Sequence, residues 1–223
     1  MLGGMRELLL VIGNRNFSSW SLRAWLAIEQ TGAPFELEQI WFDEDEDRAR
    51  RLRRSPAGKV PILLHGDLTV WDSLAIVEYL AELFPEAGLW PVERAAHARA
   101  RSLCSEMHSG FFALREELPM NCRAKKPARD RSPAVAADIA RVIALWDETR
   151  REFGAGGDFL FGRRTAADAF FAPVASRFRT YSIPLDGAAG AYCQAILSMP
   201  AMRAWLEAAQ TEGHDVPAYG DKT

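Results

Sequence analysis

The spacing of hydrophobic residues divides the chain into two parts. In the first part, short aliphatic runs alternate with segments whose apolar residues recur roughly every three to four positions, as in strands and amphipathic helices. The runs predict strands at residues 8–12, 35–42, 60–64 and 68–71, and the helical spacing predicts helices at residues 20–30, 43–54 and 73–84. The expected order of elements is therefore β-α-β-α-β-β-α.

Strand patterns fade after Gly88, and helical patterns follow at residues 93–124, 133–152, 165–178, 188–198 and 200–211. An α+β module followed by an all-helical module is the simplest interpretation. We place the first domain at residues 1–86, a linker with the start of the next helix at residues 87–98, and the helical domain at residues 99–223.

The composition is that of a globular protein. Of the 223 residues 48% are hydrophobic, and the formal net charge is -3, which argues against overall disorder and against a general attraction to nucleic acid. No apolar run approaches the roughly 18 residues of a membrane span, and the start of the chain lacks a secretory signal pattern. Cys104, Cys122 and Cys193 are too scattered for a disulfide framework or a zinc site, so we expect a cytoplasmic protein without a metal.

Residues 43–54 combine an acidic block with an arginine-rich block. An arginine run can bind nucleic acid, but acids at the start and bases at the end of one helix complement the helix dipole. We therefore favour a solvent-exposed helix and expect neither nucleic acid nor a membrane as a partner.

Three loops of the first module carry candidate binding groups. Ser18, Ser19 and Ser21 surround the start of the first helix, where hydroxyls cap backbone N–H groups or help to stabilise a bound anion such as a thiolate. In the second loop, Lys59 precedes Val60 and Pro61.

A cis Val60–Pro61 bond would expose the Val60 backbone to an extended peptide, and Lys59 could hold a carboxylate. An ordinary trans proline at an edge strand is the alternative. In the third loop Asp72 and Ser73 precede a helix. They either cap that helix or hold the amine and carboxylate of an α-amino acid terminus.

The order of these motifs resembles the cytosolic glutathione S-transferase superfamily, most closely its serine-type, zeta-like branch. The matching residues are the Ser18–Ser21 loop followed by Arg23, the Lys59–Pro61 segment and the Asp72–Ser73 pair. The segment from Thr165 to Asp168 resembles the capping box of that superfamily, in which a Thr N-cap and an acid three residues later satisfy helix-end donors. Trp20 stands where zeta-type enzymes usually have a cysteine, so zeta-specific isomerase or dehalogenase chemistry is not expected from the resemblance.

The resemblance implies a thioredoxin-like N-terminal domain, an all-α C-terminal domain, a homodimer and glutathione as co-substrate. It also implies a detoxifying transferase that activates glutathione as a thiolate for attack on a small electrophile. Ser18 would stabilise the sulfur, with Ser19 beside it, and Val60, which precedes Pro61, would pair with the cysteinyl backbone. Lys59 would approach the glycyl carboxylate, and the Asp72–Ser73 pair would hold the γ-glutamyl end.

Two alternatives to glutathione transfer remain, because a fold does not prove an activity. The protein could be a glutathione-dependent isomerase or peroxidase, or a glutathione-binding scaffold without turnover. Glutaredoxin-like disulfide exchange is disfavoured because the first helix begins with serines where that chemistry needs a cysteine. The electrophile pocket is expected between the two modules, around Met107, His108, Phe111, Phe112, Met120 and Arg123. Apolar residues at helical spacing equally form a core.

Overall fold

The computed structural model describes residues 7–42 and 45–213. Its first part contains a four-stranded sheet formed by β1 (Leu8–Ile12), β2 (Phe35–Gln39), β3 (Ile62–His65) and β4 (Leu68–Trp71). The strands lie in the order β2-β1-β3-β4. β1 runs parallel to β2 and antiparallel to β3, and β3 and β4 form an antiparallel pair.

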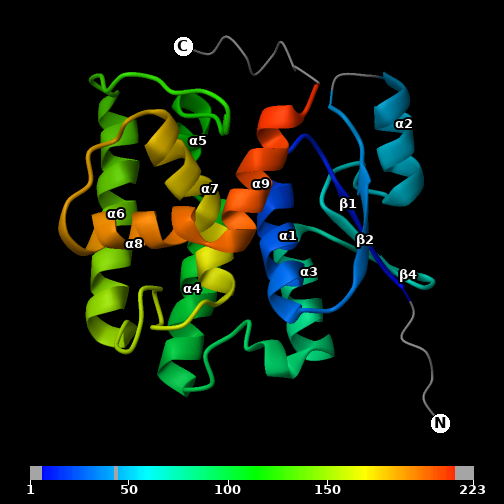
Figure 1. The fold of residues 1–223 in the computed structure, drawn as a ribbon, viewed down its shortest axis with the longest axis horizontal. Helices are drawn as coiled ribbons and strands as arrows, with labels where there is room; N and C mark the ends of the chain where they lie inside the picture. The colour runs from blue at the N-terminus through cyan, green and yellow to red at the C-terminus, as the bar shows by residue number, and fades with distance from the viewer. Residues whose placement is uncertain (1–6, 43–44, 214–223) are drawn as a thin grey trace.

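The two faces of the sheet carry different apolar side chains, as alternation along a strand requires. Leu10 and Ile12 of β1 belong to the main core together with α1 (Ser19–Thr31) and α3 (Ser73–Leu83). Val11 belongs to a smaller cluster with Ile40 and Ile62. In Figure 1, α1 and α3 lie on one side of the sheet and α2 (Asp45–Arg54) lies on the other.

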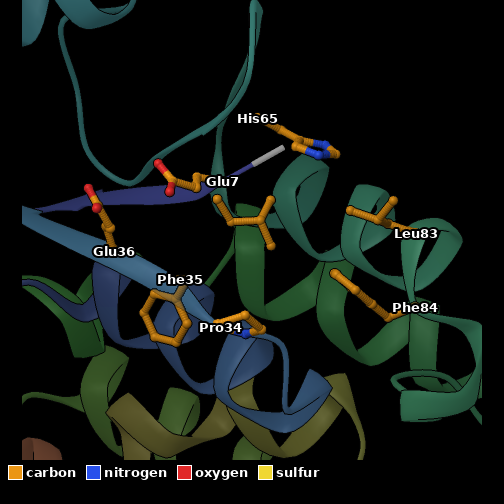
Figure 2. Close-up of a pocket in the computed structure, with 8 residues that line it drawn as sticks. Glu7, Pro34, Phe35, Glu36, His65, Leu83 and Phe84 are labelled. Atoms are coloured by element: carbon orange, nitrogen blue, oxygen red, sulfur yellow. The ribbon is translucent and has the colours of Figure 1, made fainter. Parts of the chain in front are cut away.

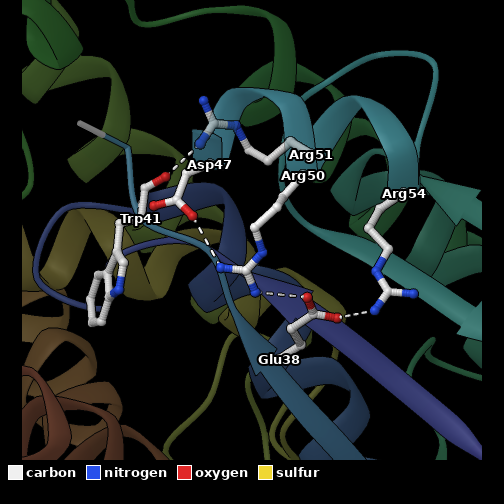
Figure 3. A network of polar contacts seen from close by, with 6 residues as sticks. All are labelled: Glu38, Trp41, Asp47, Arg50, Arg51 and Arg54. Carbon is white, nitrogen blue, oxygen red and sulfur yellow. Dashed lines mark hydrogen bonds and ion pairs between the residues drawn. The ribbon is translucent and has the colours of Figure 1, made fainter. Parts of the chain in front are cut away.

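The arginines of α2 attach this helix to β2. Arg50 pairs with Asp47 at 3.1 Å and with Glu38 of β2 at 3.1 Å, and Arg54 reaches the second oxygen of Glu38 at 2.6 Å. Figure 3 shows these pairs together with the hydrogen bond from Arg51 to the backbone carbonyl of Trp41. These arginines have the structural role favoured from the sequence.

The second part is built from α4 (Arg94–Ser109), α5 (Phe112–Glu117), α6 (Pro133–Phe153), α7 (Ala166–Thr180), α8 (Gly187–Ser198) and α9 (Pro200–Thr211), after a short 3-10 helix at Pro85–Ala87. α7 is buried along almost its whole length and packs against α1, α4 and α8. It is the central helix of this part, and its contact with α1 joins the two parts of the chain (Figure 1).

The expected capping box begins α7. The completely buried Asp168 accepts hydrogen bonds from the Thr165 backbone N–H at 2.7 Å and from the Tyr192 hydroxyl at 2.9 Å. Two further donors, the Thr165 hydroxyl at 3.2 Å and the Leu160 N–H at 3.3 Å, also bond this carboxylate. The Asp168 carboxylate thus provides acceptors for hydrogen-bond donors at the start of α7 and connects this helix to α8.

The α+β class, the order of the first seven elements and the helical second part are confirmed. The prediction of one helix over residues 93–124 is wrong, because α4 ends at Ser109, Phe111 adopts a φ of 59° and the short α5 ends at Glu117. The strands predicted to end at Phe42 and to begin at Val60 are shorter, ending at Gln39 and beginning at Ile62. The domain limits remain a prediction. Within residues 7–42 and 45–213, no helix is long and apolar enough to span a membrane.

Candidate active site

A pocket of about 340 Å³ lies where the loops of the first part face α4. Its lining residues are Trp20, Ala57, Lys59, Val60, Pro61, Trp71, Asp72, Ser73 and His108. Five of them are predicted binding residues, and they come from two separate loops. The fold therefore brings the second and third candidate loops to one site.

Ser18 is the N-cap of α1. Its side-chain oxygen accepts a hydrogen bond from the Ser21 backbone N–H at 3.2 Å and lies 2.8 Å from the Ser21 hydroxyl oxygen. The Gly13 N–H donates to that same Ser21 hydroxyl at 3.0 Å. The capping role considered from the sequence is therefore present.

Ser18 and Ser19 are nearly buried, at 3% and 5% exposure, and neither is among the residues that line the pocket. The next residue, Trp20, does line it. The first turn of α1, where the positive end of the helix dipole is located, therefore reaches the pocket through Trp20.

The Val60–Pro61 peptide bond is cis. Val60 is half-buried, and its N–H and C=O do not take part in the backbone hydrogen bonds formed among the described residues. Both groups therefore remain available to an extended ligand, which can pair with them in the manner of an added strand. Lys59 is exposed beside them on the pocket wall.

Asp72 and Ser73 start α3 at the same pocket. Asp72 has a φ of 77°, which is uncommon outside glycine and is often found at functional sites. One of its oxygens accepts a hydrogen bond from the Leu74 N–H at 2.8 Å, as an N-cap does. The Ser73 hydroxyl is completely buried and has no hydrogen-bond partner within the described residues. Buried hydroxyls normally have a partner, so Ser73 is suited to a polar ligand group.

His108 of α4 closes the pocket from the helical part. Its Nε2 lies 3.3 Å from the second oxygen of Asp72, and its ring meets the Trp20 ring edge-on at 5.0 Å. Burial lowers the pKa of His108, and the nearby Arg23 and Arg115 lower it further against the opposing effect of Asp72. The lowered pKa favours the neutral imidazole, which can act as a hydrogen-bonding group in the pocket.

Behind Trp20 lies a guanidinium without a carboxylate partner among the described residues. Arg23 is completely buried, and its charge is held between the rings of Trp20, at 4.5 Å, and Phe170, at 4.7 Å. Arg115 also faces the Trp20 ring, at 5.1 Å. Burial lowers the pKa of Arg23, and Arg115 and Arg177 lower it further. The guanidinium groups of Arg23, Arg115 and Arg177 thus lie close enough to repel one another.

The residues predicted around the electrophile differ in their exposure. Met107, Phe111 and Met120 are buried in the core, whereas Phe112 is exposed on α5. The Arg123 N–H donates to the Asn16 side chain at 3.0 Å, beside the serine loop. Of the predicted set, His108 alone lines the described pocket. Contact of the other residues with a substrate remains a prediction.

A second pocket, of about 380 Å³, lies at the opposite end of β1. Figure 2 shows its mostly apolar lining, formed by Leu8, Pro34, Phe35, Leu83 and Phe84 with Glu7, Glu36 and His65 around them. It contains none of the predicted binding residues. Across the described part of the chain, no group of three or more His, Cys, Asp or Glu side chains is placed to hold a metal ion.

Ser21, one of the three hydroxyls expected at the start of the first helix, contacts the Ser18 hydroxyl. Three lining residues, Trp20, Ala57 and Trp71, were not predicted from the sequence to belong to the site. Each lies within two residues of a predicted position. Their closeness in sequence to the predicted residues could have indicated them, but sequence alone does not show which neighbouring side chains point toward the pocket.

Known proteins are similar to this chain in the sequence that contains these loops. Residues 17–83 match the family model described as glutathione S-transferase, N-terminal domain. Glutathione S-transferase 1 of Dianthus caryophyllus is 39% identical over 161 residues, which cover 71% of this chain and 72% of that protein. A stringent starvation protein A homologue of Haemophilus ducreyi is 24% identical over 196 residues, or 86% of this chain and 85% of the other.

Among solved structures, a glutathione transferase homologue from Burkholderia with bound glutathione superimposes with a TM-score of 0.69. The two sequences are 20% identical, and the match covers 92% of this chain and 98% of that one. This likeness concerns the fold. The chain is therefore similar to glutathione S-transferases in sequence, and its fold is that of the solved transferase homologue.

Proposed function

Because the chain belongs to the cytosolic glutathione S-transferase superfamily and is a glutathione transferase, we propose that Ser18 activates the bound thiol for attack on a small electrophile. The observation that carries this proposal is the convergence of the Lys59–Pro61 and Asp72–Ser73 segments on one pocket beside the start of α1. A tripeptide lying along the Val60 backbone would place its central residue toward that helix end.

Each part of glutathione has a chemically suitable group in this pocket. The buried, unpartnered Ser73 hydroxyl suits the γ-glutamyl carboxylate, and Asp72 suits the γ-glutamyl ammonium. Val60 offers a free N–H and C=O to the cysteinyl backbone. The exposed ammonium of Lys59 suits the glycyl carboxylate as a point charge.

The Ser18–Ser21 pair can supply the hydrogen bond that a thiolate requires. In the structure the Ser18 hydroxyl donates to the Ser21 hydroxyl, which also accepts from the Gly13 N–H. Hydroxyl hydrogens rotate to suit their partners, so with a thiolate bound Ser21 can donate to Ser18 instead. Ser18 then donates its own hydrogen to the sulfur. A donor and a helix N-terminus both favour the anionic form and lower the thiol pKa.

Lowering the pKa of the thiol by about two units corresponds to roughly 2.7 kcal/mol and makes the thiolate the main species at neutral pH. Ser18 would act as a hydrogen-bond donor to the anion and not as a nucleophile, so it needs no general base. The attacking atom is the glutathione sulfur, which displaces a leaving group from the electrophile or adds to it.

The electrophile would enter beside Trp20 and His108, at the boundary between the two parts of the chain. We extend this pocket to Met107, Phe111, Met120 and Arg123, as predicted from the sequence. Apolar pockets at such boundaries commonly bind small molecules. The adjacent Ser18 and Ser19 support placement in a serine-type, zeta-like branch with a role in detoxification.

We also propose a cytoplasmic homodimer. All three cysteines are buried and unpaired, as is usual in a reducing compartment. Strand β4 lies at the edge of the sheet and exposes two large apolar side chains, Leu68 at 46% and Trp71 at 44%. An unprotected edge with such side chains is suited to a second copy of the chain.

The proposal is tested by measuring glutathione transfer to a chlorodinitrobenzene and by solving the structure with glutathione bound. We expect turnover, with the sulfur within hydrogen-bond distance of the Ser18 hydroxyl. A sulfur beside Ser19 instead would move the role by one residue. Binding to immobilised glutathione without transferase, peroxidase or isomerase turnover would favour a non-catalytic scaffold.

A further inference from the structure

The loop that carries Ser18 is held by a carboxylate from the far end of the described chain. Glu212 follows α9 and is only 7% exposed. One of its oxygens accepts a hydrogen bond from the Arg15 backbone N–H at 2.7 Å, and the other accepts from the Asn16 N–H at 3.1 Å. Backbone N–H bonds to a buried carboxylate are charge-assisted and stronger than neutral ones.

Further contacts fix the Glu212 side chain in this position. The Gln39 side-chain amide donates to the oxygen that also accepts from Arg15. The Arg15 guanidinium in turn donates to the Gln39 carbonyl oxygen at 2.7 Å. From the preceding turns of α9, the Trp205 indole N–H donates to the Arg15 carbonyl at 3.0 Å. The loop between β1 and α1 is thus attached to α9 through both its N–H and C=O groups.

The anchored residues lie inside the turn that leads to Ser18. The Asn14 carbonyl accepts hydrogen bonds from the Phe17 N–H at 3.3 Å and from the Ser18 N–H at 2.8 Å. Arg15 and Asn16 lie between these ends, so a shift of either residue changes where the turn places Ser18. Small displacements of a catalytic group can cost about a hundredfold in rate.

We propose that Glu212 is a positioning residue, which acts on thiol activation by holding the Ser18 loop in place. This inference rests on the proposed role of Ser18. The predicted contacts to the glutathione peptide come from Lys59, Val60, Asp72 and Ser73, which lie on other segments. Loss of Glu212 therefore lowers kcat and raises the pKa of the bound thiol, whereas the KM for glutathione changes little.

The test is a double-mutant cycle with Glu212→Ala, Ser18→Ala and the double variant, measured by transferase kinetics. We expect Glu212→Ala to lower kcat severalfold, by no more than Ser18→Ala does, and the double variant to be no slower than Ser18→Ala, because residues that act through one group are not additive. Glu207→Ala removes an exposed carboxylate from α9, the helix that precedes Glu212, and serves as the matched control, expected to match wild type.

A second variant distinguishes loss of the Glu212 hydrogen bonds from a general loss of structure. Glu212→Gln keeps one oxygen acceptor for the two N–H groups and is expected to fall between wild type and Glu212→Ala in kcat. Thermal unfolding followed by circular dichroism compares the variants. Additive losses in the cycle, or a raised glutathione KM at constant kcat, would overturn the positioning role. A wild-type rate in Ser18→Ala would instead refute the proposed role of Ser18.

Discussion

Replacement of the Ser18 hydroxyl is the sharpest test of thiol activation. In Ser18→Ala the backbone at the start of α1 keeps its dipole, so the thiolate loses only the hydrogen bond from the Ser18 hydroxyl, although the cap on the Ser21 N–H is lost as well. A hydrogen bond to a charged group contributes about 1.5–3 kcal/mol, which corresponds to a rise of about one to two units in the pKa of the bound thiol. The α1 dipole would preserve the remainder of the activation.

This rise fixes both the size and the pH dependence of the defect. For a wild-type thiol pKa near 6.5, the thiolate fraction at neutral pH falls from about 75% to about 3–25%, a loss of roughly three- to 25-fold in rate. Because the variant thiol ionises at higher pH, the loss is largest in acid and nearly disappears by about pH 9.5. The assay is kcat with saturating glutathione across this range, together with the thiolate absorbance of the complex.

The capping role of Ser18 predicts a different result. Loss of an N-cap to Ala costs about 0.5–2 kcal/mol of stability, whereas Gly at the same position costs only a few tenths. Ser18→Gly therefore separates the two roles, since it keeps most of the capping stability but removes the hydroxyl. A Ser18→Gly enzyme with wild-type rates at neutral pH, or a Ser18→Ala defect independent of pH, would refute thiol activation by this residue.

Other consequences of the structure can be measured separately. Asp72→Ala removes the expected ammonium partner, so the glutathione KM should rise about tenfold with a smaller change in kcat; an unchanged KM would contradict the proposed pose. Asp168→Ala leaves four buried donors unsatisfied, and chemical denaturation should show a loss of about 3 kcal/mol or more; an unchanged stability would contradict this role. Burial raises the pKa of both Cys122 and Cys193 to about 11, so a thiol reagent such as dithionitrobenzoate should label the cysteines only after unfolding, and rapid labelling of the native protein would be contrary evidence.

Local signals explain why most elements could be predicted from the sequence. Aliphatic runs bounded by turn residues correctly indicated β1 and β4, and the helix ends follow from caps such as Gly32 with its φ of 67°. The break between α4 and α5 was missed because Leu114 and Leu118 continue the helical spacing past Gly110. Periodicity reports the buried face of a segment and does not reveal a change in its direction.

In the candidate site, too, interactions within one loop could be predicted from the sequence, whereas interactions between distant segments could not. Groups that act within their own loop, such as the Asp72 cap and the cis Val60–Pro61 bond, were anticipated as possibilities from neighbouring residues. His108 reaches Asp72 from another helix, and Glu212 is separated from Arg15 by 197 positions. No local pattern encodes such a pairing, because it arises only when α9 packs against α1. If the Ser18 loop depends on that packing, the helical part contributes to thiol activation as well as to binding the electrophile.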